Sequence, residues 1–410
     1  MPIDRDKQRQ FAEEVVERLR GAGYEALWAG GCVRDALLGL TPKDYDVATS
    51  ATPDEVRKVF GKRRTIPVGV AFGVMTVLGP KSAGQIEVAT FRTEGAYSDG
   101  RRPDSVKFAT AELDSGRRDF TINGLFFDPI AGDVIDYVGG QADLEAGVVR
   151  AIGDADARIV EDKLRMLRAV RFAARFGFTI EPATEQAVRC RGSEIVQVSG
   201  ERIGAEMRAM LMDTNRARAL ELLRTTQLEP HVLPELAEVD NGAFQELLVV
   251  VRSMEDPTLA MVLAALMRGE VGVRIAGSLA RRWKLPNRDA SRADWLLDKL
   301  STIAAARSVP WPQLQRVLVH EGALELVALA AAIAGTEDPA VKLCRAKLAL
   351  PMDELNPAPL VTGDDFIHLG IAPCPEFGTW LETIRDAQIE GQIRTREEAL
   401  RMVRVLSEIE

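Results

Sequence analysis

A short apolar strand that ends in two glycines, with a pair of aspartates soon after it, is the feature that most constrains this chain. The apolar run from Leu27 reaches Gly30 and Gly31, and Asp44 and Asp46 follow with one residue between them. Backbone amides at a turn of two glycines can approach a bulky anion such as phosphate closely, because no Cβ blocks the way. Alternate residues of a strand point to the same face, so the two aspartates would hold their carboxylates side by side.

Two adjacent carboxylates repel each other, and divalent cations between them relieve the repulsion. Together with a phosphate-binding turn, such a pair indicates phosphoryl or nucleotidyl transfer assisted by Mg²⁺. Each motif alone has an ordinary explanation, since a Gly-Gly pair is usually a turn and an Asp-x-Asp is usually a solvated strand end or a cap. Their order and close spacing favour the catalytic interpretation.

Length, charge and cysteine spacing exclude several classes of protein. The chain has 410 residues, 46% of them hydrophobic, which suggests roughly two to four domains. The charged start and the lack of an apolar stretch of membrane-spanning length predict a cytoplasmic protein without a membrane. Four widely spaced cysteines without a C-x-x-C pair indicate neither a zinc site nor a disulfide framework. The net charge of −9 argues against general nucleic-acid binding, although a local basic stripe can still grip a nucleic-acid backbone.

Strand signals are confined to the first part of the chain. Short β-type runs, separated by glycine and proline, occur at 26–29, 45–48, 74–78, 85–91 and 134–137. Thr52 before Pro53 is typical of a helix start among them. After about residue 150, apolar residues recur at helical spacing almost to the end. We therefore expect an α+β fold with an N-terminal mixed-sheet catalytic head over 1–150, followed by an all-α neck over 151–215, body over 216–300 and tail over 301–410.

Three further motifs place polar groups in apolar surroundings. Glu87 lies within a β-type run and could add a third carboxylate beside the Asp-x-Asp. The segment 117–123 concentrates arginine, carboxylate and amide groups; it is either a capped helix start or a site for triphosphate and ribose, since guanidinium forks match phosphate oxygens. Asp162, Arg165 and Arg168 are spaced by three and would form one polar stripe of a helix, in the simplest case an ion pair worth roughly a few tenths of a kcal/mol.

Taken together, these motifs resemble the class II tRNA nucleotidyltransferase family, which includes CCA-adding enzymes and bacterial poly(A) polymerases. The resemblance runs from about residue 27 to 236 and resumes over 360–399. It implies that Asp44 and Asp46 are metal-binding catalytic carboxylates, and the strand position of Glu87 adds it to them as a third candidate catalytic carboxylate. It also implies a nucleotide-binding set made of Gly30, Gly31, Arg34, Arg117, Arg118, Asp119, Asn123, Glu161, Asp162, Arg165 and Arg168.

Two more positions bear on the resemblance. The segment 201–207 matches the helix that braces the base-selecting motif in the family. Gly124 is a departure, because the family usually has alanine there.

The resemblance implies a reaction in which the 3′-hydroxyl of tRNA attacks the α-phosphate of CTP or ATP with Mg²⁺ as cofactor and no protein partner required. Cytosine and adenine both present an amino donor beside a ring-nitrogen acceptor, and uracil and guanine reverse this pattern. The carboxylate of Asp162 can accept from the amino group while Arg165 donates to the ring nitrogen, so that protein side chains replace a nucleic-acid template. A wrong base would leave buried polar groups without partners, at about 1–3 kcal/mol each.

Full CCA synthesis is the first interpretation, and three others remain open: a partial enzyme that adds only CC or only A, a poly(A) polymerase, and an RNA-binding scaffold that has lost the carboxylates. The segment 95–107, with Asp99 and Arg102, predicts a mobile charged loop. In the family such a loop is associated with the switch to A addition and is shortened in CC-only relatives. The loop therefore favours full activity, and the acidic end over 406–410 differs from the basic extension of poly(A) polymerases.

Overall fold

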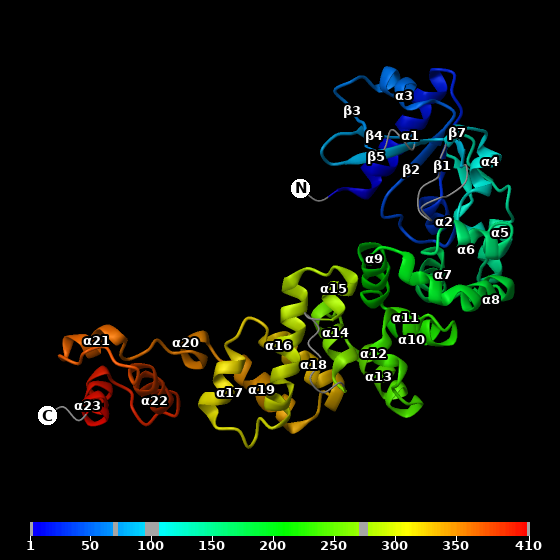
Figure 1. Cartoon of the computed structure of the whole chain (residues 1–410). Helices are drawn as coiled ribbons and strands as arrows, with labels where there is room; N and C mark the ends of the chain where they lie inside the picture. The colour runs from blue at the N-terminus through cyan, green and yellow to red at the C-terminus, as the bar shows by residue number, and fades with distance from the viewer. Residues whose placement is uncertain (1–2, 69–72, 95–105, 270–277, 408–410) are drawn as a thin grey trace. The chain divides into compact units, whose positions relative to one another are not determined.

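A computed structural model describes residues 3–68, 73–94, 106–269 and 278–407 (Figure 1). Contacts within it divide the chain into two compact units, Met1–Val239 and Asp240–Glu410. The first unit contains a seven-stranded sheet and helices, and the described part of the second contains helices only. The expected α+β class is confirmed. The finer division into head, neck, body and tail stays a prediction.

The sheet of the first unit has the strand order β3-β4-β5-β2-β1-β8-β9. Neighbouring strands run antiparallel, except that β2 and β5 are parallel. The strands are β1 Ala26–Ala29, β2 Asp46–Thr49, β3 Thr65–Ile66, β4 Val74–Leu78, β5 Gln85–Thr90, β8 Phe126–Asp128 and β9 Asp133–Ile135.

The parallel pair sets the geometry of the site. In its register Asp46 lies opposite Glu87, and residues directly opposite each other on neighbouring strands project from the same face. The chain returns from β2 to β5 through helix α3, Pro53–Phe60, and strands β3 and β4. Thr52 caps α3 in a capping box with Glu55, and Pro53 occupies its first turn, as the sequence predicts.

Helix α1, Arg5–Gly21, packs against β1, β2 and β5 and buries one apolar face that includes Phe11, Val15 and Leu19. These residues are four apart, and the helical period therefore places them on the same face. A separate antiparallel hairpin is formed by β6, Arg92–Glu94, and β7, Val106–Phe108. The remaining helices of this part are α2 Gly31–Leu37, α4 Ala111–Gly116 and α5 Gly140–Ala146, with a 3₁₀ turn at Thr121–Asn123.

Two backbone pairings join the helices that follow to the sheet region. Strand β10, Val148–Val149, pairs in parallel with β11, Thr179–Ile180, and an isolated bridge links Phe120 to Ala151. The helices of this part are α6 Ala155–Glu161, α7 Arg165–Phe176, α8 Pro182–Arg191, α9 Gly200–Leu211, α10 Arg216–Thr225, α11 Glu229–Val232 and α12 Pro234–Ala237, with a 3₁₀ turn at Gly192–Gln197.

The second unit has an apolar core built around α14, which is buried at all nine of its residues and contacts α16 and α18. Farther along, Phe366, Ile384 and Val403 form a smaller cluster. The described helices of the second unit are α13 Asn241–Ser253, α14 Leu259–Met267, α15 Leu279–Trp283, α16 Asn287–Ala304, α17 Trp311–Leu318, α18 Ala323–Ala334, α19 Pro339–Leu348, α20 Met352–Leu355, α21 Gly363–His368, α22 Phe377–Ile389 and α23 Arg396–Leu406.

Among the described residues, no single helix has the length and apolar character needed to cross a membrane. The sharply bent pair α17 and α18 passes that test only when the two helices are taken together.

Candidate active site

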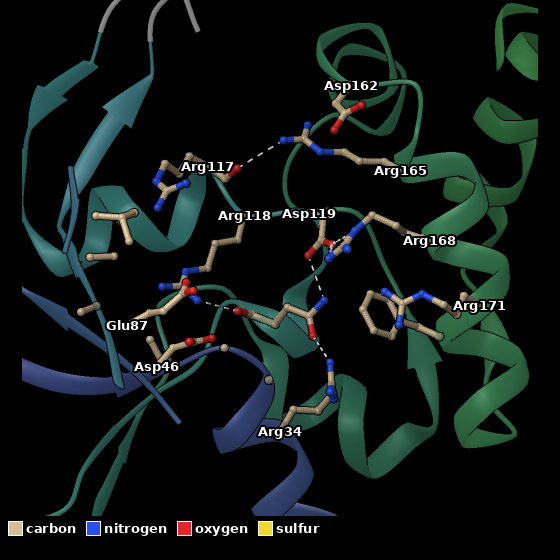
Figure 2. A pocket seen from close by; sticks show the side chains of 18 of the residues that line it. Arg34, Asp46, Glu87, Arg117, Arg118, Asp119, Asp162, Arg165, Arg168 and Arg171 are labelled. Carbon is tan, nitrogen blue, oxygen red and sulfur yellow. Dashed lines mark hydrogen bonds and ion pairs between the residues drawn. The ribbon is translucent and has the colours of Figure 1, made fainter. Parts of the chain in front are cut away.

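A pocket of about 570 Å³ lies in the first unit, between the sheet and helix α7 (Figure 2). Its walls come from the ends of β1 and β2, from β5, from the segment that follows α4, and from one face of α7. Most of the residues expected at the site line it: Gly30, Gly31, Arg34, Asp46, Glu87, Arg117, Arg118, Asp119, Asn123, Asp162, Arg165 and Arg168.

Asp44 and Glu161 are not among the described residues that line this pocket. Asp44 precedes β2, and Glu161 ends α6. Asp99 and Arg102 lie outside the described residues. Arg171 and Arg175, which the sequence analysis missed, do line the pocket. Arg171 lies three residues after Arg168 and Arg175 lies four residues after Arg171, and this helical spacing is a signal that could have found them.

Asp46 and Glu87 bring two carboxylates to one wall. Desolvation in the pocket, together with the negative charges of Asp44 and Glu87, raises the pKa of Asp46 to about 6 against the opposing effect of Arg118. The strand begins only at Asp46, so the expectation of both aspartates on one strand is wrong. Asp44 nevertheless lies near enough for its charge to act on Asp46.

These donors fit a divalent cation. Carboxylate oxygens are the ligands that Mg²⁺ prefers, and it usually keeps several waters and takes substrate phosphates as further ligands. Within the described ranges, no three His, Cys, Asp or Glu side chains are close enough together to hold a metal ion by themselves. A cation at Asp46 and Glu87 would therefore complete its coordination with water and phosphate oxygens, and it would relieve the repulsion that raises the pKa of Asp46.

Gly30 is required where β1 turns into α2. Its φ of 70° is in the left-handed region, and a Cβ at this position would lie 2.8 Å from Nη1 of Arg118. Any larger residue would therefore push Arg118 away. The backbone amides of the first turn of α2 follow directly at Gly31, where helix geometry leaves N–H groups available to an anion.

Arg34 is 4% exposed and contacts protein groups on several sides. Its Nε donates to Asp35 at 2.8 Å and its Nη1 donates to Oδ1 of Asn123. The guanidinium group also lies 5.0 Å from the ring centre of Phe172 and 4.7 Å from that of Phe176. Burial lowers the pKa of Arg34, and the charge of Asp35 opposes this shift. Arg34 thus links α2 to α7 and orients Asn123.

Asp119 continues this network toward α7. One of its oxygens accepts from Nδ2 of Asn123 at 2.9 Å, and the other accepts from Nε of Arg168 at 2.7 Å. Burial alone would raise the pKa of Asp119, but Arg168 and Asn123 lower it to about 2. Glu206 on α9 pairs with both Arg168 and Arg171. Asp119 and Glu206 therefore hold Arg168 and Arg171 of α7 in fixed positions beside the pocket.

The expected polar stripe of Asp162, Arg165 and Arg168 on one helix is wrong. Asp162 has extended backbone angles, φ −145° and ψ 103°, in a break between α6 and α7. Arg165 begins α7 and pairs with Glu161 at 2.7 Å rather than with Asp162. Asp162 instead accepts two hydrogen bonds from Arg202 on α9, at 2.7 and 3.2 Å.

Gly124 has a local explanation. A Cβ there would lie 2.6 Å from Cγ2 of Val138 and 3.2 Å from Cδ1 of Ile152. Alanine at this position would require both side chains to move. The departure from the family's alanine therefore follows from the packing of this chain.

The mixed sheet and its pocket define a nucleotidyltransferase of the poly(A) polymerase class. Residues 26–150 match the family model described as the poly A polymerase head domain. Residues 177–239 match the model described as a probable RNA and SrmB-binding site of polymerase A. Both matches lie in the first unit.

Within that class, the chain belongs to the CCA-adding enzyme family. It is 35% identical over 386 residues to the CCA-adding enzyme of Limosilactobacillus fermentum, covering 93% of each chain. It is 37% identical over 398 residues to that of Geobacillus thermodenitrificans, covering 95% of each. The crystal structure of the Bacillus stearothermophilus CCA-adding enzyme in complex with CTP matches with a TM-score of 0.78, 31% identity and coverage of 98% of this chain and 99% of that chain.

Proposed function

We propose that this protein adds CCA to the 3′ end of tRNA from CTP and ATP, without a nucleic-acid template, in the cytoplasm. One observation carries the proposal: a single pocket is lined by a carboxylate pair, by clustered arginines, and by the candidate base-selecting pair Asp162 and Arg165. Each of these serves a separate need of nucleotidyl transfer. The relatives that match over nearly the whole chain are named CCA-adding enzymes.

The proposed reaction joins the 3′-hydroxyl of tRNA to the α-phosphate and releases pyrophosphate. Asp44 and Asp46, with Glu87 beside them, would hold Mg²⁺, which lowers the pKa of the attacking hydroxyl and neutralises charge on the phosphates when it is bound. Arg117 and Arg118 would bind the triphosphate, because forked guanidinium groups match phosphate oxygens. Asn123 and Asp119, oriented by Arg34 and Arg168, would contact the sugar and phosphates.

Base selection would be carried by Asp162 and Arg165. Arg202 donates two hydrogen bonds to the carboxylate of Asp162. These bonds fix the direction of the remaining lone pairs of that carboxylate. Arg165 donates to Glu161 and to the carbonyl of Arg158, both at 2.7 Å. The pairs fix both side chains, so a base with reversed donors and acceptors would meet groups that cannot turn to suit it.

The decisive experiment offers purified protein three tRNA transcripts that end at the discriminator base, at C and at CC, with each nucleoside triphosphate separately. We expect C to be added to the first two, A to be added only to the third, and little use of UTP or GTP. An enzyme that stops at CC, or extends only the third transcript, would be a partial enzyme. Long A tails on any RNA would indicate a poly(A) polymerase, and no incorporation would indicate a scaffold.

A further inference from the structure

Asp114, on α4, is a buried carboxylate that does not line the pocket, yet it binds two arginines that do. The residue is 1% exposed. Its Oδ1 accepts from Nε of Arg117 at 2.8 Å. Its Oδ2 accepts from Nε and Nη2 of Arg118, at 3.3 and 3.0 Å. Neither the carboxylate pair nor the base-selecting pair involves it.

Without a carboxylate between them, the guanidinium groups of Arg117 and Arg118 would repel each other and sample many rotamers. Arginine side chains carry much rotamer entropy, which a fixed partner removes before a ligand binds. Asp114 binds Arg118 along one edge, and the guanidinium group then lies 4.8 Å from the ring centre of Phe126 and donates from Nη1 to the carbonyl of Asn123 at 3.3 Å. Figure 2 shows Arg118 reaching toward Asp46 and Glu87.

A fourth hydrogen bond extends the connection to the sheet. Oδ1 of Asp114 also accepts from the backbone N–H of Arg92 at 3.1 Å. Arg92 begins β6, which follows β5 after the fully buried Phe91, and β5 carries Glu87. One carboxylate is thus bonded both to the two arginines and to the chain that continues from the strand of Glu87.

We propose that Asp114 is a positioning residue that holds Arg117 and Arg118 in the orientation needed to bind the β- and γ-phosphates of the incoming nucleotide. The inference rests on the proposed function, because that function assigns the triphosphate to these two arginines. Asp114 touches no substrate and acts only through them. It should therefore affect the affinity for triphosphates of every base alike and leave tRNA binding unchanged.

The test compares Asp114→Asn with a control carboxylate, Asp143. Asp143 is 8% exposed, accepts from Thr121 at 2.6 Å and from Arg150, and does not line the pocket. For Asp114→Asn we expect the Kd of CTP and of ATP to rise about tenfold or more, as for loss of charge-assisted hydrogen bonds, and the Kd of CMP to change little. Asp143→Asn should lower the melting temperature and leave the Kd of CTP unchanged.

A normal Kd for CTP in Asp114→Asn would overturn the inference, and so would an equal loss of CMP and CTP binding, which indicates general disruption. Arg117→Gln and Arg118→Gln separate this failure from that of the proposed function. If both arginine variants bind CTP normally, the triphosphate assignment itself is wrong and the inference falls with it. If they lose CTP and Asp114→Asn does not, the inference alone is wrong.

Two further measurements keep the test decisive. Adding Asp114→Asn to the Arg117→Gln and Arg118→Gln double variant should weaken CTP binding no further, because residues that act through one another are not additive. If Asp114→Asn does not fold, Asp114→Glu keeps the charge and moves it by one methylene. Asp114→Glu should then still show weaker binding of CTP than of CMP relative to the natural protein, and full CTP affinity in it would contradict the proposal.

Discussion

The two compact units bury different kinds of side chain. In the first, charged groups are buried around the pocket: Arg34, Asp35, Asp114, Arg165 and Glu206 are all at most 9% exposed. In the described part of the second unit, the buried polar side chains are Gln315 and Asp365, and the core is otherwise apolar. Burying a charge costs free energy unless it is paired and hydrogen-bonded. The first unit therefore maintains a polar network for its chemistry, whereas the second is stabilised mainly by apolar packing.

This difference explains where the family can be recognised. Both matching family models lie within residues 26–239, where the chemistry of the pocket restricts the residue types that can line it. An apolar helical core accepts many sequences of suitable size and pattern, so it retains fewer recognisable residues. We expect substitutions near the pocket to change activity more than stability, and substitutions in the core of the second unit to do the opposite.

The largest expected effect comes from the pocket carboxylates. Asp46→Asn should reduce incorporation of both CTP and ATP by about 10³-fold or more, because one metal site serves both steps. The melting temperature should not fall, since a repelling charge is removed. The matched variant Asp365→Asn, in the second unit, removes the charge that pairs with Arg396 and weakens the capping contact to Thr362, so it should lower the melting temperature with turnover unchanged. Near-normal turnover in Asp46→Asn would contradict the assignment of the metal site.

A substitution that creates a cavity in the core of the second unit should lower stability and leave nucleotide binding unchanged. Leu263 in α14 is fully buried, so Leu263→Ala should lower the free energy of unfolding by about 2–5 kcal/mol. Binding of CTP by the first unit should persist below the transition, as measured by calorimetry. Leu324→Ala is the control, because Leu324 is 73% exposed and its loss should change stability by no more than about 0.5 kcal/mol. Loss of CTP binding in folded Leu263→Ala would show that the contrast between the units is wrong.

Arg202 tests whether the polar network of the first unit controls specificity. Arg202→Ala removes the two hydrogen bonds that Arg202 donates to Asp162 and leaves only the one from the backbone N–H of Leu164 among those described. Discrimination between CTP and UTP should therefore fall about tenfold, measured as the ratio of kcat/KM values. The control is Arg189→Ala, whose partner Glu185 lies on the same exposed helix face. An unchanged ratio in Arg202→Ala would mean that Asp162 needs no bracing or does not select the base.

The smallest expected effect is a pH dependence in metal-free buffer. The folded pKa of Asp46, about 6, lies above the usual value near 3.9 for an unfolded chain. Between these values the folded protein binds the extra proton, so stability decreases as pH rises from about 4 to 6. The melting temperature of the natural protein should therefore fall relative to Asp46→Asn over this range, and Mg²⁺ should restore part of the difference at pH 7. Parallel curves would contradict the raised pKa.

Much of the first unit could be predicted from local patterns. The apolar run that ends at Gly30, the cap at Thr52, and the strands at 74–78 and 85–90 depend on the residues themselves and on their immediate neighbours. Most of the residues expected at the site also line one pocket. These residues could be predicted because metal binding needs carboxylates and phosphate binding favours arginine and glycine, which leaves few alternatives.

The sequence predictions were wrong or incomplete where a side chain binds a residue that is distant in the chain. Spacing alone placed Asp162 and Arg165 on one helix, but Asp162 has extended backbone and pairs with Arg202 on α9. Arg202 is forty residues away from Asp162 in the chain, so no local pattern contains it. The role of Asp114 was missed for the same reason, because a carboxylate in a short helix is ordinary until its partners are seen.

The parallel pairing of β2 and β5 also determines which insertions and deletions the gene can tolerate. Asp46 and Glu87 face each other across this pair, while the forty residues between them pass through α3, β3, β4 and their turns. Extra residues in those turns lengthen the connection and leave the pairing intact. A single-residue slip within β5 would instead turn Glu87 to the opposite face of the sheet. We therefore expect natural length variation in this region to be confined to the turns and absent from the two strands.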